Sequence, residues 1–201
     1  MSTTLMILAV ALGLGLSLGP GANPAAAQDD DKQPVVVMDT SMGTITIQLD
    51  AEKAPITTEN FLKYVDGHFF DGLTFHRVIR GFMIQGGGFD EQLRQKDQGL
   101  RAPIRNESHN GLTNTRGTIA MARTSDPNSA TCQFFINHKD NPALDQGAGY
   151  AVFGKVIDGM NVVDKIAEVP TTRKRAANGQ PMSDVPAEPV IIKSVRRKGK
   201  G

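Results

Sequence analysis

Residues 43–50 read Gly-Thr-Ile-Thr-Ile-Gln-Leu-Asp, and apolar and polar side chains alternate along them. A period of two places the two isoleucines and Leu49 on one face of a β-strand and the polar residues on the other. Residues 35–38, Val-Val-Val-Met, precede this stretch across the turn-rich residues 39–42. The two runs therefore predict a β-hairpin with one buried face.

Further short apolar runs follow, and most are bounded by Gly, Pro, Asn or Asp, as is typical of strands. Many strands, few helices and no βαβ alternation predict an all-β-dominated domain, either a barrel or a sandwich. Two long stretches, residues 86–116 and 170–189, are expected to be irregular loops. The additional strand candidates are residues 73–79, 83–85, 118–122, 134–137, 150–157 and 190–195.

Only two stretches have the features of α-helices. The first follows Pro55; either Thr57 or Thr58 is expected to cap it, and Gly67 to end it. Its apolar stripe consists of Phe61, Leu62 and Val65. The second covers residues 161–167 and ends before Pro170.

The composition indicates a soluble globular protein. Of the 201 residues, 39% are hydrophobic and 21% are charged, which argues against general disorder. The formal net charge of +1 gives no global field that points to nucleic acid. Because Cys132 is the only cysteine, an intramolecular disulfide is excluded, and we expect Cys132 to be a small buried filler. The basic clusters at residues 173–175 and 196–200 are interpreted as a solvated loop and a frayed terminus.

The first residues of the chain have the pattern of an export signal. Residues 5–18 are almost wholly apolar, and Ala25-Ala26-Ala27 follow before the acidic residues 29–31. The apolar run is shorter than the about 20 residues that a spanning helix needs, and small residues at the end are typical of a signal peptide. We therefore predict a signal peptide over residues 1–27, cleaved after Ala27, and a short extension over residues 28–33. An uncleaved membrane anchor is the alternative, because no Lys or Arg precedes the apolar run.

Familiar catalytic motifs and metal-ligand spacings are absent from the sequence. None of the four histidines has the close spacing of a metal pair, and His76 is interpreted as a core histidine. The glycines at 86–88 lack the lysine of a phosphate loop and are interpreted as a turn. Arg77, in the apolar run Phe75-His76-Arg77-Val78-Ile79, is costly to bury unless it is paired or functional. The pattern alone leaves both explanations of Arg77 open.

Four blocks of the sequence follow one another in order: FHRVIRGFMIQGG at 75–87, GTIAMAR at 117–123, SATCQFFI at 129–136, and Leu144-Asp145 with YAVFGKV at 150–156. They resemble the cyclophilin family of peptidyl-prolyl cis-trans isomerases, over roughly residues 34–196. The resemblance implies a closed eight-stranded antiparallel β-barrel capped by two α-helices. The loop at residues 103–107, together with residues 114–117, resembles the bacterial exported branch. A basic tail follows the domain at residues 197–201.

The resemblance implies a role for ten residues. Arg77, Phe82 and Gln85 match catalytic positions of the family. At three positions the chain departs from many eukaryotic members: Arg123 stands for asparagine, Tyr150 for histidine and Ala143 for tryptophan. The lost tryptophan argues against tight cyclosporin binding. The positions that match substrate-binding residues are Met83, Ala122, Arg123, Gln133, Phe135, Leu144 and Tyr150.

The resemblance further implies an isomerase of X-Pro bonds that assists the folding of exported proteins in the periplasm. It needs no metal and no cofactor, and its partners are proline-containing unfolded or nascent polypeptides. We expect a monomer with no nucleic-acid partner and no stable membrane association after signal cleavage. A peptide-binding or chaperone module without turnover is the first alternative. A nucleic-acid binder that uses the basic tail is the second, although interleaved aromatic residues are absent.

Overall fold

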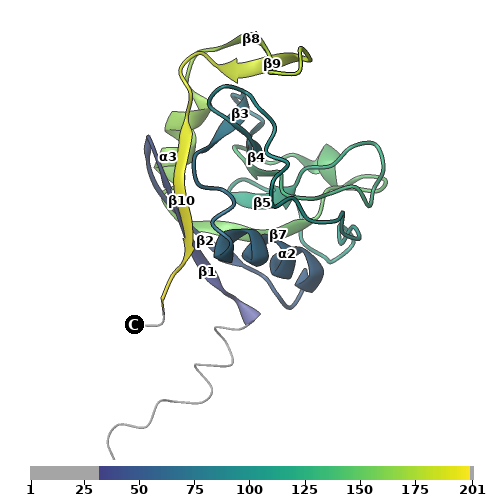
Figure 1. Cartoon of the computed structure of the whole chain (residues 1–201). Coiled ribbons are helices and arrows are strands. Elements are labelled where there is room, and N and C mark those ends of the chain that lie inside the picture. The colour runs from purple at the N-terminus through teal and green to yellow at the C-terminus, as the bar shows by residue number, and fades with distance from the viewer. Residues whose placement is uncertain (1–31, 200–201) are drawn as a thin grey trace, which may run out of the picture.

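The computed structural model describes residues 32–199. Eight strands close into a barrel in the order β1-β10-β3-β4-β6-β5-β7-β2, and every neighbouring pair is antiparallel (Figure 1). This confirms the predicted closed eight-stranded antiparallel barrel with two α-helices. The strands are β1 (Val35–Thr40), β2 (Gly43–Leu49), β3 (Leu73–Ile79), β4 (Met83–Asp90), β5 (Thr118–Met121), β6 (Phe134–Asn137), β7 (Val152–Asp158) and β10 (Ile191–Arg197), and the helices are α2 (Pro55–Asp66) and α3 (Met160–Ala167).

The predicted first hairpin is formed by β1 and β2. Met38 lies opposite Ile45 and Val36 lies opposite Ile47, and all four side chains are fully buried. Directly opposed residues of antiparallel strands share a face of the sheet, so the period-two pattern of both strands meets in the barrel interior. This hairpin therefore supplies one wall of the main hydrophobic core.

Helix α2 is capped by a residue far away in the sequence. The expectation that Thr57 or Thr58 caps it is wrong, because both lie inside the helix and are buried, and the N-cap residue Ala54 makes no side-chain bond. The Glu107 carboxylate accepts the Ile56 N–H at 3.2 Å and the Thr57 N–H at 2.8 Å. A carboxylate at this end satisfies free donors and complements the positive end of the helix dipole.

Both stretches expected to be irregular contain strands. Strand β4 continues to Asp90, so the three glycines at 86–88 lie in a strand rather than in a turn. Glycines carry no side chains from which alternation can be read, although Gly87 does use a positive φ of 88°. The second stretch holds a separate hairpin of β8 (Thr171–Arg175) and β9 (Pro181–Pro186). Its mostly exposed, polar residues gave no strand signal.

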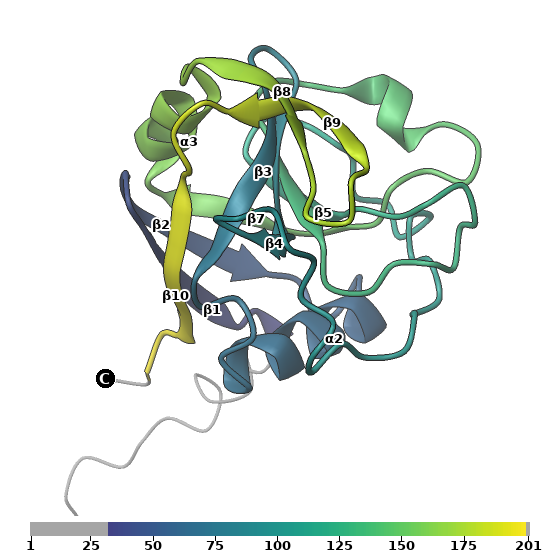
Figure 2. The same ribbon diagram turned by 45° about the horizontal axis from the view of Figure 1, so that its top comes forward.

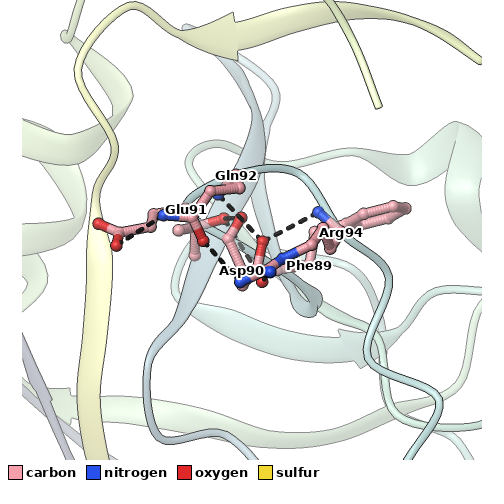
Figure 3. Close-up of polar contacts among 6 residues, drawn as sticks. Phe89, Asp90, Glu91, Gln92 and Arg94 are labelled. Atoms are coloured by element: carbon pink, nitrogen blue, oxygen red, sulfur yellow. Dashed lines mark hydrogen bonds and ion pairs between the residues drawn. The ribbon is translucent and has the colours of Figure 1, made fainter. Parts of the chain in front are cut away.

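The β8–β9 hairpin lies over the barrel beside β3 (Figure 2). Its tip is attached to the turn that ends β4, because the Ala177 N–H donates to the Leu93 carbonyl at 3.0 Å. Asp90 organises this turn: its carboxylate accepts the backbone N–H groups of Gln92 and Arg94 and the Arg94 Nε–H, at 2.8–3.0 Å (Figure 3). The hairpin is thus held along β9 by β3 and at its tip by the turn.

The end of the domain is more ordered than the sequence suggested. Strand β10 runs through Arg197, the first residue of the predicted tail, and Arg196 and Arg197 form ion pairs with Asp71 and Asp66 at 2.6 Å. A frayed terminus is therefore wrong for these two residues. The predicted signal peptide and most of the extension at 28–33 lie outside the described residues. Within residues 32–199, no helix has both the length and the apolar character needed to cross a membrane.

Candidate active site

A row of outward-facing residues crosses four strands of the barrel. In β6, Phe134 points into the main core, so its neighbour Phe135 points outward, as a period of two requires. Phe135 pairs with Gln85 of β4 on one side and with Ala120 of β5 on the other. Gln85 in turn pairs with Arg77 of β3. Opposed side chains lie about 5 Å apart, so Arg77, Gln85, Phe135 and Ala120 form one continuous row.

This row forms the floor and one side of a hollow of about 130 Å³. The floor belongs to a second apolar cluster, separate from the main core, with Met83, Ala120, Phe135 and Val152 at its buried centre. The structure brings nine of the ten residues named from the sequence to this hollow, and Gln133 lies beside it. The lining residues are Arg77, Phe82, Met83, Gln85, Ala122, Arg123, Phe135, Leu144 and Tyr150.

Arg77 lies at the rim of the hollow, on the outside of the barrel. Its side chain is 40% exposed, and its Nε lies 3.9 Å from Asp184 Oδ2 of β9. Asp184 has a positive φ of 59°, a conformation that Asp and Asn adopt more readily than most residues. This contact involves Nε of the guanidinium, so the two Nη groups do not take part in it. The sequence gave no signal for Asp184, because it falls in the stretch expected to be a loop.

Gln85 is held in place by a second glutamine. Its Nε2 donates to Gln133 Oε1 at 3.0 Å. The Gln133 side chain lies against Gly88, where a Cβ would be 2.7 Å from the amide carbon, so only glycine allows this approach. The Gln133 side chain therefore orients the amide of Gln85, and Gly88 of β4 leaves the space for that side chain.

His76 lies next to Arg77 in β3 but is buried, as expected for a core histidine. Burial lowers its pKa from the ordinary value of 6.5 to about 4, so the ring is neutral at pH 7. Its Nδ1 makes no hydrogen bond within the described part of the chain. Cys132 is also buried, and burial raises the pKa of its thiol, which agrees with a packing role.

Arg123 and Tyr150 form a rigid side of the hollow. The Arg123 Nε and Nη2 both donate to the Gly149 carbonyl, at 3.0 and 2.9 Å, and its guanidinium carbon lies 4.5 Å from the centre of the Tyr150 ring. The Tyr150 ring meets the Phe135 ring edge-on at 5.7 Å. The Arg123 guanidinium is thus committed to bonds within the protein.

A buried amide network fixes the remaining side of the hollow, and sequence reasoning missed it. Asn141 Nδ2 donates to the Phe82 carbonyl at 2.9 Å and to Asn137 Oδ1 at 2.7 Å. Asn114 Nδ2 donates to Asp145 Oδ1 at 2.7 Å, at the end of the 3₁₀ helix η1 (Pro142–Asp145), which carries Leu144. The network joins segments that are distant in the sequence, so no local sequence pattern predicts it.

A larger hollow of about 340 Å³ lies elsewhere, between β2, β7 and residues 111–118. Lysines, threonines and glutamines make up much of its lining, and no aromatic side chain is among them. Nor does any group of three His, Cys, Asp or Glu side chains within residues 32–199 have the arrangement of a metal site. The smaller hollow beside Arg77 combines a charged donor with an apolar floor, as ligand sites commonly do.

Comparison with known proteins agrees with this geometry. Residues 35–197 match the family described as cyclophilin type peptidyl-prolyl cis-trans isomerase/CLD. The chain belongs to the cyclophilin family. Peptidyl-prolyl cis-trans isomerase B of Escherichia coli is 52% identical over 167 residues, covering 80% of this chain and 98% of that protein. A peptidyl-prolyl cis-trans isomerase of Acinetobacter baylyi is 54% identical over 167 residues, covering 82% of this chain and 85% of that protein.

Solved cyclophilin structures share the fold. A cyclophilin-type isomerase of Cryptosporidium parvum, crystallised in the presence of the dipeptide Ala-Pro, has a TM-score of 0.68 and 26% identity, covering 83% of this chain and 99% of that one. The cyclophilin described here is a peptidyl-prolyl cis-trans isomerase, as its family and its bacterial relatives establish. Rotation about an amide bond breaks no covalent bond, so this activity does not require a nucleophile.

Proposed function

We propose that the hollow beside Arg77 binds the X-Pro segment of a polypeptide and is where the prolyl bond rotates. The observation that carries this proposal is the row in register across β3, β4, β6 and β5, which puts a guanidinium at one end of an apolar floor. The crystal structure of the Cryptosporidium relative in the presence of the dipeptide Ala-Pro supports a ligand of this kind.

The reaction sets the requirements for such a site. The barrier to rotation is about 18–20 kcal/mol, because resonance gives the C–N bond partial double-bond character. The two isomers of an X-Pro bond differ by only about 0.5–1 kcal/mol, yet they exchange over tens of seconds or longer. A catalyst must therefore weaken the resonance and hold one side of the bond while the other side turns.

The apolar side chains hold the proline ring. Phe82, Met83, Phe135 and Leu144 line the hollow and offer no hydrogen-bonding group to the ring. The Phe135 ring is itself fixed, because it packs against the Tyr150 ring in an edge-to-face arrangement. Such a clamp immobilises the prolyl side of the bond and leaves the preceding residue free to rotate toward the solvent.

Arg77 stabilises the twisted amide. As the bond twists, the proline nitrogen regains a lone pair that accepts a hydrogen bond, which the planar amide does not offer. A guanidinium is always charged and presents several donors in a fixed plane, so it can donate to this nitrogen and to the adjacent carbonyl. Its interaction is stronger in the twisted state than in either planar isomer, which is the condition for catalysis.

The polar residues around the floor bind the peptide backbone in this proposal. Gln85 and Gln133 form a pair of oriented amides next to Arg77. The Ala122 N–H already donates to the Gln133 carbonyl at 2.9 Å, so Ala122 contributes its carbonyl oxygen to a peptide. Arg123 contributes through its backbone and its packing on Tyr150, because its guanidinium is committed to Gly149.

We further propose that the protein acts as a monomer on unfolded or nascent exported polypeptides in the periplasm. The support is the signal-like pattern of residues 1–27 and the bacterial origin of the relatives. The mass of the mature protein from the native host tests the export step, because cleavage after Ala27 leaves Gln28 as the first residue. A full-length chain recovered with the membrane fraction would instead support an uncleaved anchor.

The site is tested by the exchange rate of an X-Pro peptide, measured by NMR with and without enzyme. Leu144→Ala removes part of the clamp from a partly exposed position, and we expect a three- to tenfold lower kcat/KM. The control is Ile157→Ala, which removes an exposed apolar side chain on β7, outside the hollow. The proposed site would be wrong if Leu144→Ala had the same kcat/KM as the wild type and the peptide changed the amide chemical shifts of residues away from the row.

A further inference from the structure

The turn that carries Phe82 is only partly buried. It joins β3 to β4, and Gly81 adopts a positive φ of 73° within it. Neither Gly81 nor Phe82 is buried, in contrast to Met83 and Ile84 that follow, although Phe82 packs against the second apolar cluster. Hydrogen bonds from outside the turn add to this packing in holding Phe82.

Those bonds come from the segment that follows β6. The His138 N–H donates to the Phe82 carbonyl at 3.0 Å, beside the Asn141 amide described above. The His138 side chain adds a second hold, because its Nδ1 accepts the Gly81 N–H at 2.9 Å. His138 thus binds backbone groups of two consecutive residues of the turn, Gly81 and Phe82.

The other ring nitrogen of His138 is anchored to helix α3. Its Nε2 lies 3.2 Å from Asp164 Oδ1, and only 16% of the His138 side chain is exposed. Because Nδ1 accepts a bond, the proton of the neutral ring is assigned to Nε2, which donates to Asp164. Arg116 holds this carboxylate in turn, with Nη2 at 2.8 and 2.9 Å from its two oxygens, and donates from Nη1 to the His138 carbonyl.

We propose that His138 is a positioning residue for isomerisation. Its neutral imidazole joins the Gly81–Phe82 turn to helix α3 and so keeps Phe82 at the edge of the hollow. The inference rests on the proposed role of the hollow, and it assigns to His138 no contact with substrate. It needs a side chain that accepts from a backbone N–H at one end and donates to a carboxylate at the other, which neutral histidine does.

Protonation of the ring opens this connection. An imidazolium carries a proton on both nitrogens, so Nδ1 no longer accepts the Gly81 N–H. The charged groups next to the ring are Asp164 on α3 and Arg116, with Lys139 and Asp140 on the same segment as His138. Asp140 accepts the Arg116 N–H, and Arg80 on the turn pairs with Glu168 at 3.3 Å.

The test compares four forms of the protein in the peptide-exchange assay at pH 8: wild type, His138→Ala, His138→Asn and His109→Asn. His138→Ala should lower kcat/KM about three- to tenfold, the effect of one lost hydrogen bond. His138→Asn should stay within about twofold of wild type, since its Oδ1 replaces Nδ1 as the acceptor. His109→Asn changes an exposed histidine remote from the turn and should have no effect.

Two further readouts separate positioning from a loss of stability. The Gly81 amide should be protected from hydrogen exchange in the wild type and in His138→Asn, and lose protection in His138→Ala. The chemical shift of the Gly81 amide should be similar in the wild type and in His138→Asn, and should differ in His138→Ala. If His138→Ala does not fold, hydrogen exchange of the Gly81 amide in the wild type and in His138→Asn decides the question alone.

Three results would overturn the inference: His138→Ala activity equal to wild type, equal losses in the alanine and asparagine variants, or a Gly81 amide that exchanges without protection in the wild type. An inactive wild type, or a Leu144→Ala variant as active as the wild type, would instead refute the proposed role of the hollow. The two failures are therefore distinguishable.

Discussion

Replacement of Arg77 by alanine is the sharpest test of how this cyclophilin accelerates rotation. Two arginines, Arg77 and Arg123, line the hollow. The Arg123 guanidinium donates to the Gly149 carbonyl, whereas the Arg77 guanidinium, which the change removes, has no such bond to a backbone carbonyl among the described residues. All other lining residues keep their positions, because Arg77 lies outside the main core. The variant therefore separates stabilisation of the twisted amide from binding of the proline ring.

The magnitude follows from what Arg77 does in each state. Loss of one preorganised donor to developing charge costs about 10²–10³ in rate, or about 2.7–4 kcal/mol. Because the Arg77 side chain is 40% exposed, water replaces part of the interaction, and we expect a value near 10². Its pair with Asp184 is 3.9 Å long and exposed, so the free energy of unfolding should change by less than about 1 kcal/mol.

The measurement is kcat/KM for a proline peptide, by NMR exchange or a protease-coupled assay, together with urea unfolding. Arg105→Ala serves as the matched control, because it removes an exposed loop arginine outside the hollow. Arg77→Lys should fall between wild type and alanine, because an ammonium keeps the charge but lacks the planar donors. An Arg77→Ala enzyme within threefold of wild type, with unchanged folding, would refute the role given to the guanidinium.

Three further predictions concern the parts around the site. The His76 ring takes a proton near pH 6.5 in the unfolded chain and only near pH 4 in the folded protein. The free energy of unfolding should therefore fall by about 3 kcal/mol as the pH drops through that window. Urea titrations at pH 7.5 and 4.5 measure this change, and His76→Gln should remove it. Glu107→Ala should destabilise the fold by about 1 kcal/mol through loss of the bonds to the first turn of α2, with Glu107→Gln smaller, as thermal unfolding will show. Gly88→Ala should displace the Gln133 amide and lower kcat/KM several-fold; unchanged activity would mean that the orientation of Gln133 is unimportant.

Many of the strands were predictable because their apolar residues recur locally. Alternation in residues 43–49 predicted the buried face of β2. The local pattern left a barrel and a sandwich open, and the closed barrel was predicted only from the resemblance to the cyclophilin family. Strand β4 was predicted only over its first three residues, since glycines at 86–88 carry no pattern. The β8–β9 hairpin was missed because most of its residues are exposed and polar, so neither face shows a run of apolar side chains.

The residues that support the site were not predictable from local spacing. Glu107 caps a helix that begins about 50 residues earlier, and Asp184 approaches Arg77 from more than 100 residues later in the chain. His138 was noted only as one of four histidines without a metal spacing. Each depends on which loops the closed barrel brings together, and that is a property of the whole topology rather than of a motif.

The openness of the hollow is itself a requirement of the reaction. A catalyst of bond rotation must grip one flank of the amide and let the other sweep through about half a turn, so an enclosed pocket would block the motion it has to promote. The barrel meets both requirements. Four strands in register form the floor of the hollow, whereas Arg77 and Leu144 lie at its partly exposed rim. Rigidity is needed at the floor, because a guanidinium distinguishes the twisted from the planar amide only if it cannot follow the motion. In the proposed site, the hydrogen bonds that fix Gln85, Arg123 and the Phe82 turn are therefore as important for catalysis as the side chains proposed to contact the substrate.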